Sequence, residues 1–355
     1  MTLFMLYEHL FGLNQDKRTQ NWVRFITSES LKGIRGDFQK ERFMMETNRY
    51  NFLSPVHLLS VILKGISQVF LIENAFTGLI ILFGIAIASP KLAIIAFTSS
   101  LIGTLIGTYF GGDKALTQIG LYGYNSVLTG LAIVIYMDDI QRWFIALVGA
   151  AIAAVMMAAM LHVTKNLDIP VLTFPFIVVT SFFLLATYHL QIFELSPIVA
   201  PQPLDERTMQ LGGNPNFIKG LIKGISEVFI IDSFWTGICM LLGLFWAGWR
   251  YGVYVVLGTI VSWLTAYYLG AEITLINLGL YCYNAVLTII AVELTYGRTK
   301  LRPFPFTGTI AAIITVPVTA SINTLFLPLG LPTLTMPFVL CTWFFLSARN
   351  ILPKL

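Results

Sequence analysis

The sequence predicts an all-α integral membrane protein made of two inverted structural repeats with a pore between them. Three observations support this prediction: an apolar composition, a series of long apolar segments, and a set of motifs that occurs twice. Of the 355 residues, 56% are hydrophobic and only 11% are charged, whereas an ordinary soluble domain has about 25% charged residues. So few charges cannot cover the surface of a soluble protein of this size. The composition therefore excludes a conventional soluble enzyme, a disordered chain and a nucleic-acid-binding protein.

Residues 1–53 differ from the rest of the chain because they contain eight basic and six acidic residues. Residues 1–20 lack the basic, apolar and small-residue regions of a signal peptide. A basic excess beside the first apolar segment favours the cytoplasmic side of a membrane. We therefore expect a cytoplasmic N-terminal tail over residues 1–53.

Twelve apolar segments follow the tail, in two sets of six. The first set is 54–72, 74–89, 91–111, 116–136, 142–163 and 170–192, and the second is 216–231, 234–249, 251–270, 275–296, 305–327 and 332–350. A full crossing needs about 20 residues. The first segment of each set carries Lys and Gln or Glu and is only partly apolar, which suits a re-entrant half-helix buried in protein. Each half, residues 54–192 and residues 216–355, is thus expected to contain five transmembrane helices and one half-helix.

Three sequence blocks recur in the same order in the two sets, which indicates an internal duplication. The pairs are Lys64–Gly78 with Lys223–Gly237, Gly120–Thr129 with Gly279–Thr288, and Ile169–Phe176 with Leu331–Phe338. An odd number of crossings per half inverts the second half relative to the first, as in many transporters with sites near the midplane. The connector, residues 193–215, has Arg207 as its single basic residue beside three acidic ones, so we expect it to be external.

The candidate transport residues are polar or aromatic side chains that occupy equivalent positions in the two halves. Burying a polar group costs free energy, which partners or a wet pore must offset. The pairs are Gln68 with Glu227, Thr173 with Thr335, Tyr124 with Tyr283, and Leu128 with Leu287. Prolines flank each threonine and remove N–H donors, which leaves backbone carbonyls free for other partners. A row of oxygens beside flat aromatic surfaces suits a small, planar, neutral molecule rich in N–H donors, and urea is such a molecule.

The sequence resembles the urea transporter family, in its bacterial type. The Leu-Pro-x-x-Thr-x-Pro-Phe signature is intact at Leu331–Phe338 and recurs with Ile for Leu at Ile169–Phe176. The Gln-Val and Glu-Val pairs at residues 68 and 227 match in order and spacing, and the resemblance covers about residues 54–350. The resemblance implies a homotrimeric channel with one pore through each protomer. The short loops separately favour a bacterial inner membrane, with a plasma membrane elsewhere as the alternative.

The resemblance also implies roles for individual residues. Two oxygen ladders would be formed by Gln68, Glu227, Thr173 and Thr335. A hydrophobic slot would be lined by Val69, Val228, Leu71, Tyr124, Leu128, Phe234, Tyr283 and Leu287. Three of these depart from the family pattern, because Tyr124 and Tyr283 replace phenylalanine and Leu71 replaces an aromatic residue. These departures are expected to change the width of the slot or the choice between urea and its analogues.

We expect passive transport, in which urea loses water and donates N–H bonds to successive oxygens. Each such bond contributes about 0.5–1.5 kcal/mol net, and weak repeated sites are what conduction requires. Two states remain open for Glu227: burial favours the protonated form, whereas Lys223 one turn earlier could keep it charged. Glu73 and Asp232 are also duplicated, and we expect them to interact with the start of the following helix.

The alternative is an ion-coupled secondary transporter of a small neutral solute, which would use intramembrane carboxylates as cation sites. Glu227 is a candidate for such a site, but its counterpart Gln68 is neutral. An ammonium or water channel fits poorly because there are no duplicated histidines, and no nucleophile–base set suggests a membrane enzyme. The three cysteines lack metal-ligand spacing. We therefore expect no cofactor and no metal, with urea and the lipid bilayer as the partners.

Overall fold

The computed structural model describes residues 54–165, 167, 169–190, 194–205, 207, 209, 212–296 and 305–352. The expected cytoplasmic tail, residues 1–53, lies outside the described residues. The chain divides into two units, residues 1–58 and 59–355. The description below concerns the second unit and the helix that leads into it.

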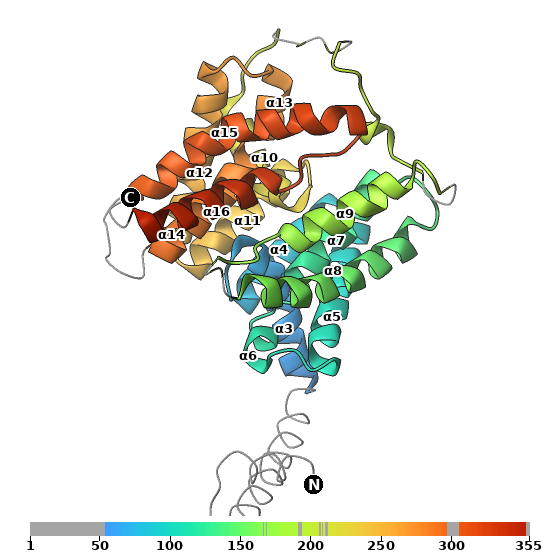
Figure 1. Ribbon diagram of the computed structural model, residues 1–355. Helices are drawn as coiled ribbons and strands as arrows, with labels where there is room; N and C mark the ends of the chain where they lie inside the picture. The colour runs from blue at the N-terminus through green and yellow to red at the C-terminus, as the bar shows by residue number, and fades with distance from the viewer. Residues whose placement is uncertain are drawn as a thin grey trace, which may run out of the picture. The chain divides into compact units, whose positions relative to one another are not determined.

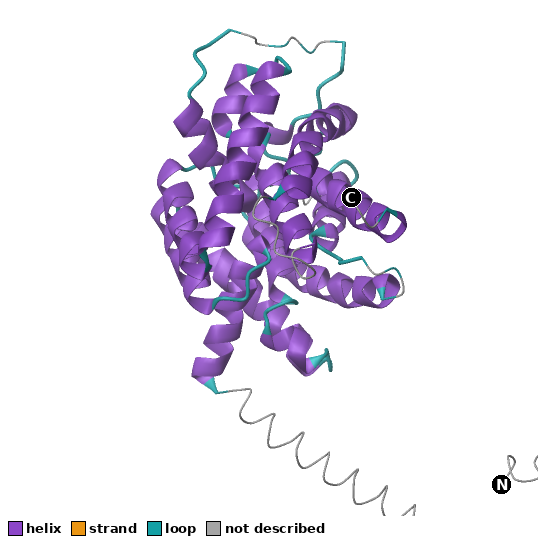
Figure 2. Ribbon diagram, turned by 90° about the vertical axis from the view of Figure 1, so that its left-hand side faces the viewer, coloured by secondary structure: helices purple, strands orange, loops and turns teal. Residues whose placement is uncertain are grey.

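The described residues are mostly helical and contain no strand, which confirms the all-α prediction (Figure 2). The first half contains α3 (Pro55–Ser67), η1 (Gln68–Phe70), α4 (Ala75–Ala88), α5 (Pro90–Tyr109), α6 (Lys114–Gln118), α7 (Gly123–Tyr136), α8 (Arg142–Thr164) and α9 (Phe174–Ala186). The second half contains α10 (Phe217–Ser226), η3 (Glu227–Phe229), α11 (Phe234–Ala247), α12 (Trp249–Tyr268), α13 (Ile273–Leu278), α14 (Cys282–Tyr296), α15 (Phe306–Phe326), η4 (Leu327–Leu329) and α16 (Met336–Ile351). The short η2 (Pro197–Val199) lies between the halves.

The order of elements is the same in both halves, except that η4 lies between α15 and α16 in the second half. A short helix and a 3₁₀ turn come first in each half, and they bend into the next helix by 76° at α3–α4 and by 78° at α10–α11. The turn at each bend is made by a non-glycine residue in the left-handed region, Leu71 (φ 61°) or Ile230 (φ 61°). This conformation is uncommon for a side chain of this size. The duplication in sequence is therefore also a duplication of local backbone structure.

Four helices in the described part of the chain are long and apolar enough to cross a membrane: α5, α8, α12 and α15 with η4. The number rises to six if each bent pair counts as one span. Two segments expected to be continuous, 116–136 and 275–296, are each divided into a short helix and a longer one. The division occurs at Gly120 (φ 81°) and Gly279 (φ 77°). A Cβ at these positions would lie 2.3 Å from the backbone nitrogen of Gly65 or of Gly224, so these turns need glycine for a close approach.

The two halves contact each other through reciprocal interactions between α4 and α11, which pack side by side (Figure 1). The Thr77 hydroxyl donates to the Gly243 carbonyl at 3.0 Å, and the equivalent Thr236 hydroxyl donates to the Gly84 carbonyl at 2.8 Å. Reciprocal contacts between equivalent residues are the signature of a two-fold relation. The largest cluster of buried apolar side chains includes residues of both halves, so the halves share one core.

Candidate functional site

The clearest contact between predicted site residues is the one between Thr173 and Thr335. Their hydroxyl oxygens lie 2.6 Å apart in a hydrogen bond, and neither side chain is more than 3% exposed. Thr173 is the N-cap residue of α9 and Thr335 is the N-cap residue of α16. Two short helices, α9 from the first half and α16 from the second, therefore meet at their N-termini through this pair of hydroxyls.

Local sequence explains why both helices begin at the threonine. Leu172 (φ 53°) and Leu334 (φ 47°) lie in the left-handed region just before it, which a helix cannot continue. A proline follows at the second helical position of both α9 and α16, where its missing N–H costs nothing. The motif thus combines a strained turn with a sharp helix start. Strained backbone of this kind clusters at functional sites.

A tyrosine from the duplicated second block fixes each strained turn. The Tyr283 hydroxyl donates to the Leu334 carbonyl at 2.7 Å and lies 3.0 Å from the Thr333 hydroxyl. In the first half the Tyr124 hydroxyl donates to the Leu172 carbonyl. The two tyrosines are therefore more than flat walls, because their hydroxyl groups bind the residue that precedes each threonine.

An asparagine follows each tyrosine, and it binds the same turn. The Asn125 amide donates to the Leu172 carbonyl at 3.3 Å, and the Asn284 amide donates to the Leu334 carbonyl at 3.2 Å. A carbonyl oxygen has two lone pairs, and the tyrosine and asparagine together fill both. These two leucine carbonyls are consequently occupied, and the nearest open acceptors are side-chain oxygens.

A partly enclosed cavity lies beside Thr335, and most of the residues that line it belong to the second half. It has about 320 Å³ of space between side chains and at its mouth. Four predicted residues line it: Glu227, Val228, Tyr283 and Thr335. The first half contributes Tyr136, from the end of α7, and Phe176, from the start of α9. The cavity is thus a small space with aromatic and apolar walls, and its acceptors are a carboxyl group and hydroxyl groups.

The remaining predicted residues do not line this cavity. Seven of them are placed elsewhere: Gln68, Val69, Leu71, Tyr124, Leu128, Phe234 and Leu287. Leu128 and Leu287 are fully buried in the shared core. Phe234 is the first residue of α11 and its ring packs edge-on against Trp235 at 5.9 Å. Leu71 is partly buried and forms the bend after η1.

Gln68 is oriented by a hydrogen bond to the backbone. Its Nε2 donates to the Ile119 carbonyl at 3.1 Å, and its side chain is 5% exposed. This hydrogen bond uses the amide nitrogen and not the amide oxygen, which is an acceptor. Glu227 occupies the equivalent place in η3, beside Tyr136 and Tyr283 in the cavity. The two halves thus present an amide on one side and a carboxyl group on the other.

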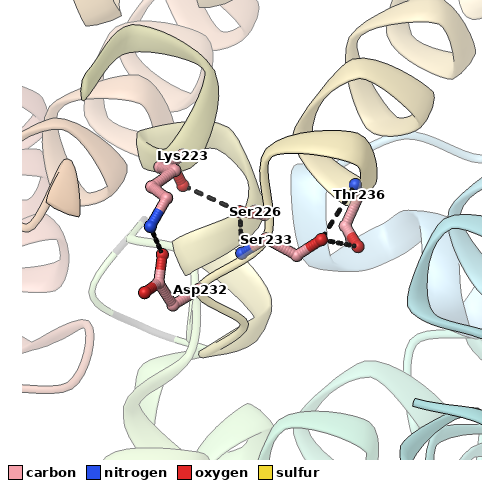
Figure 3. Close-up of polar contacts among 5 residues, drawn as sticks. All are labelled: Lys223, Ser226, Asp232, Ser233 and Thr236. Atoms are coloured by element: carbon pink, nitrogen blue, oxygen red, sulfur yellow. Dashed lines mark hydrogen bonds and ion pairs between the residues drawn. The ribbon is translucent and has the colours of Figure 1, made fainter. Parts of the chain in front are cut away.

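Lys223 has two carboxyl groups nearby in sequence, Glu227 and Asp232, and it forms an ion pair with Asp232. Lys223 Nζ contacts Asp232 Oδ1 across the bend between α10 and α11 (Figure 3). The side chain that caps the start of α11 is Ser233, which accepts the Thr236 N–H at 3.3 Å, and Asp232 beside it is paired with Lys223. The Ser226 hydroxyl donates to the Lys223 carbonyl at 2.9 Å and holds the same bend. In the described part of the chain the ion pair of Lys223 is therefore with Asp232 and not with Glu227.

Sequence reasoning missed several residues of the site. They are Tyr136, Phe176, Ile230, Leu280 and Leu334, which line the cavity, and Asn125 and Asn284, which bind the strained turns. The asparagines carried a usable signal, because each follows the tyrosine in a duplicated block. Tyr136 carried none, because it lies outside the three blocks.

Comparison with known proteins identifies the family of the chain. The model of the urea transporter family matches residues 59–350. Urea transporter 1 of Ovis aries is 28% identical over 301 residues, which cover 80% of this chain and 75% of that protein. Urea transporter 1 of Capra hircus shows the same identity and coverage. Urea transporter 1 of Rattus norvegicus is 28% identical over 295 residues, with 80% and 75% covered.

Proposed function

We infer, because the chain belongs to the urea transporter family, that it carries urea passively across a membrane. It is a multi-pass membrane protein and a transporter, not an enzyme. The observation that carries the mechanism is the hydrogen bond between Thr173 and Thr335, where the N-termini of two half-helices meet. We propose that the passage for urea runs through this point.

The proposed route begins in the cavity beside Glu227 and Tyr283. Urea enters edge-on between the apolar and aromatic walls and donates N–H bonds to oxygens instead of to water. At the threonine pair its N–H groups replace the hydrogen bond that joins the two hydroxyls. On the other side it reaches the amide oxygen of Gln68. Each exchange is worth about 0.5–1.5 kcal/mol net, which is weak enough for the molecule to leave.

The remaining predicted residues form the walls of this route in our proposal. They are Val69, Val228, Leu71, Tyr124, Leu128, Phe234 and Leu287. The duplication supports this assignment, because all except Phe234 have an apolar or aromatic counterpart among the candidates or at the equivalent bend. A substitution that introduces a charged side chain at such a position should block urea. The apolar slot cannot replace the water around that charge, so the hydrated side chain would obstruct the passage.

The N-termini of α9 and α16 provide a reason for the exclusion of cations. Each helix N-terminus carries the equivalent of about half a positive charge, and α9 and α16 direct theirs at the same point. Ammonium would be repelled by both positive helix ends while losing its water. Urea is neutral and would not be repelled. This argues against the alternative of an ion-coupled transporter, which needs a cation site along the route.

Glu227 is proposed to take part in its neutral form. Among the described residues, the ion-pair partner of Lys223 is Asp232, and this leaves Glu227 without a direct salt bridge to Lys223. A protonated carboxyl group is also the closest chemical equivalent of the Gln68 amide at the matching position, because it has one donor and an acceptor oxygen.

The topology and assembly are further parts of the proposal. We propose inverted halves, residues 54–192 and 216–355, an external connector over residues 193–215, and a cytoplasmic tail over residues 1–53 in a bacterial inner membrane. The reciprocal contacts between α4 and α11 support a two-fold relation between the halves. The homotrimer rests on the family resemblance. Reporter fusions at the tail and the connector test the topology, and native mass spectrometry in detergent tests the trimer.

The test of the function is urea flux into proteoliposomes, followed by stopped-flow light scattering with an inward urea gradient and no ion gradient. We expect entry to be much faster than in empty liposomes and unchanged when sodium or proton gradients are added. Entry that saturates readily and depends on an ion gradient would support the coupled transporter. Entry no faster than in empty liposomes, from folded and inserted protein, would refute urea transport.

A further inference from the structure

We propose that Asn125 and Asn284 are positioning residues that keep the two threonine hydroxyls directed at each other. The inference rests on the proposed function, because it assigns these residues a role at the same site. Asn125 in α7 caps the start of α9, and Asn284 in α14 caps the start of α16. The capping frees the threonine at the helix start for the passage.

The argument begins with the ordinary behaviour of a threonine at a helix start. The N-cap side chain normally accepts a hydrogen bond from the N–H of the second or third helical residue. In α16 the second residue is Pro337, which has no N–H. The third is Phe338, whose N–H is already bound by Asn284 Oδ1 at 3.2 Å. Thr335 accordingly makes no capping hydrogen bond with its side chain.

The first half repeats this arrangement. Pro175 is the second residue of α9, and the N–H of Phe176 donates to Asn125 Oδ1 at 3.1 Å. Thr173 makes no capping hydrogen bond with its side chain either. Both threonines are thus released from the role that their position would give them, and their hydroxyls bind each other. The same solution in both halves argues against an accident of packing.

The second arm of each asparagine completes the positioning. Asn284 Nδ2 donates to the Leu334 carbonyl at 3.2 Å, and Asn125 Nδ2 donates to the Leu172 carbonyl at 3.3 Å. Each amide therefore joins the strained residue before the threonine to the third helical residue after it. The two asparagines are 0% exposed, so their amide groups have no bulk water as an alternative partner. The threonine lies between the two attachment points, which fixes its direction.

Loss of the asparagine has a specific consequence. In Asn284→Ala the N–H of Phe338 loses its acceptor, and the Thr335 hydroxyl is the nearest side-chain oxygen that can replace it, in the usual capping geometry. The hydroxyl then turns away from Thr173 and no longer serves the permeant. The asparagine thus acts on transport through Thr335.

The experiment compares urea and acetamide permeability in proteoliposomes for the parent, Asn284→Ala, Thr335→Val and the double variant. Acetamide has one amino group where urea has two, so its permeability depends less on the threonine hydroxyl as a hydrogen-bond acceptor. The ratio of the two permeabilities does not depend on how many molecules are folded. We expect the urea-to-acetamide ratio to fall at least about twofold in Asn284→Ala. We expect no further fall when this change is added to Thr335→Val.

Two further variants guard the interpretation. Asn284→Asp keeps an acceptor for the Phe338 N–H but loses the donor to the Leu334 carbonyl, so its ratio should fall between those of the parent and Asn284→Ala. The matched control is Asn277→Ala, because the Asn277 amide also accepts from the Asn216 N–H and donates to the Asn214 carbonyl, but its side chain is only half-buried and lies away from the threonine pair. Its ratio should equal that of the parent. If Asn284→Ala does not fold, Asn125→Ala is measured instead with Thr173→Val.

The outcomes separate the inference from the function. Equal losses of urea and acetamide permeability in Asn284→Ala would overturn the positioning role. A ratio that falls by the same factor in the Thr335→Val background would overturn it as well, because the asparagine would then act independently of the threonine. Absence of urea flux in the parent would instead refute the proposed function.

Discussion

The hydrogen bond between Thr173 and Thr335 makes a sharp prediction about transport. Replacing either threonine with valine keeps its shape and removes the hydroxyl group. The permeant then loses one acceptor, which is worth about 0.5–1.5 kcal/mol net. At 25 °C this corresponds to a decrease of about two- to thirteenfold in urea permeability. Stopped-flow light scattering of proteoliposomes, normalised to the amount of inserted protein, measures the decrease.

The double variant tests whether the two hydroxyls act as a pair. In either single variant the remaining hydroxyl is buried without its partner, which costs about 1–3 kcal/mol. Removing both hydroxyls eliminates that cost. We therefore expect the double variant to be closer in thermal stability to the parent than the sum of the single losses predicts. Parent-like urea permeability in both single variants would refute the reasoning, because it would place the passage away from this pair.

Three further predictions concern the carboxyl group, the ion pair and a close backbone contact. Glu227→Gln should keep urea permeability within about twofold of the parent between about pH 6 and pH 8, because the amide mimics a neutral carboxyl group; a much larger loss would show that the charge matters. Lys223→Met should lower the melting temperature in detergent more than the double variant Lys223→Met with Asp232→Asn, because the single change leaves a carboxylate without its counter-ion; equal melting temperatures would contradict the pairing. Gly78→Ala should destabilise the protein by about 1–3 kcal/mol, because its Cβ would lie 1.9 Å from the Leu63 carbonyl oxygen; unchanged unfolding on heating would contradict this close approach.

The duplication made much of the fold and part of the site predictable. Equivalent residues occupy equivalent local structure, so pairing Gln68 with Glu227 and Thr173 with Thr335 placed each at the start of a matching element. Proline after the threonine predicted a sharp helix start. The aromatic and apolar residues near these positions could be named as candidates because the same spacing occurs twice.

Contacts between the halves could not be predicted, because spacing along a chain does not fix how two halves dock. The direct bond between the two threonines is such a contact. So is the entry of Tyr136 into a cavity made mainly by the second half. The choice of Asp232 over Glu227 by Lys223 has a similar cause, since a bend of 78° decides which carboxyl group the lysine reaches. Helical spacing had left pairing of Lys223 with Glu227 open.

If the proposed route is correct, the meeting of two helix N-termini at a pair of hydroxyls connects the selectivity of the passage with its speed. Two positive helix ends repel a cation, so the site needs no charged residue of its own to exclude ammonium. The hydroxyls, however, can satisfy each other when no urea is present. The empty passage therefore leaves no buried acceptor pair unpaired, and an entering urea exchanges one hydrogen bond for others of similar strength. Because neither the empty nor the occupied state is strongly favoured, the molecule is admitted and released without a large barrier. A protein that bound urea tightly at this point would lose this balance. A protein without Asn125 and Asn284 would lose it too, if the threonine hydroxyls turned back to cap their own helices.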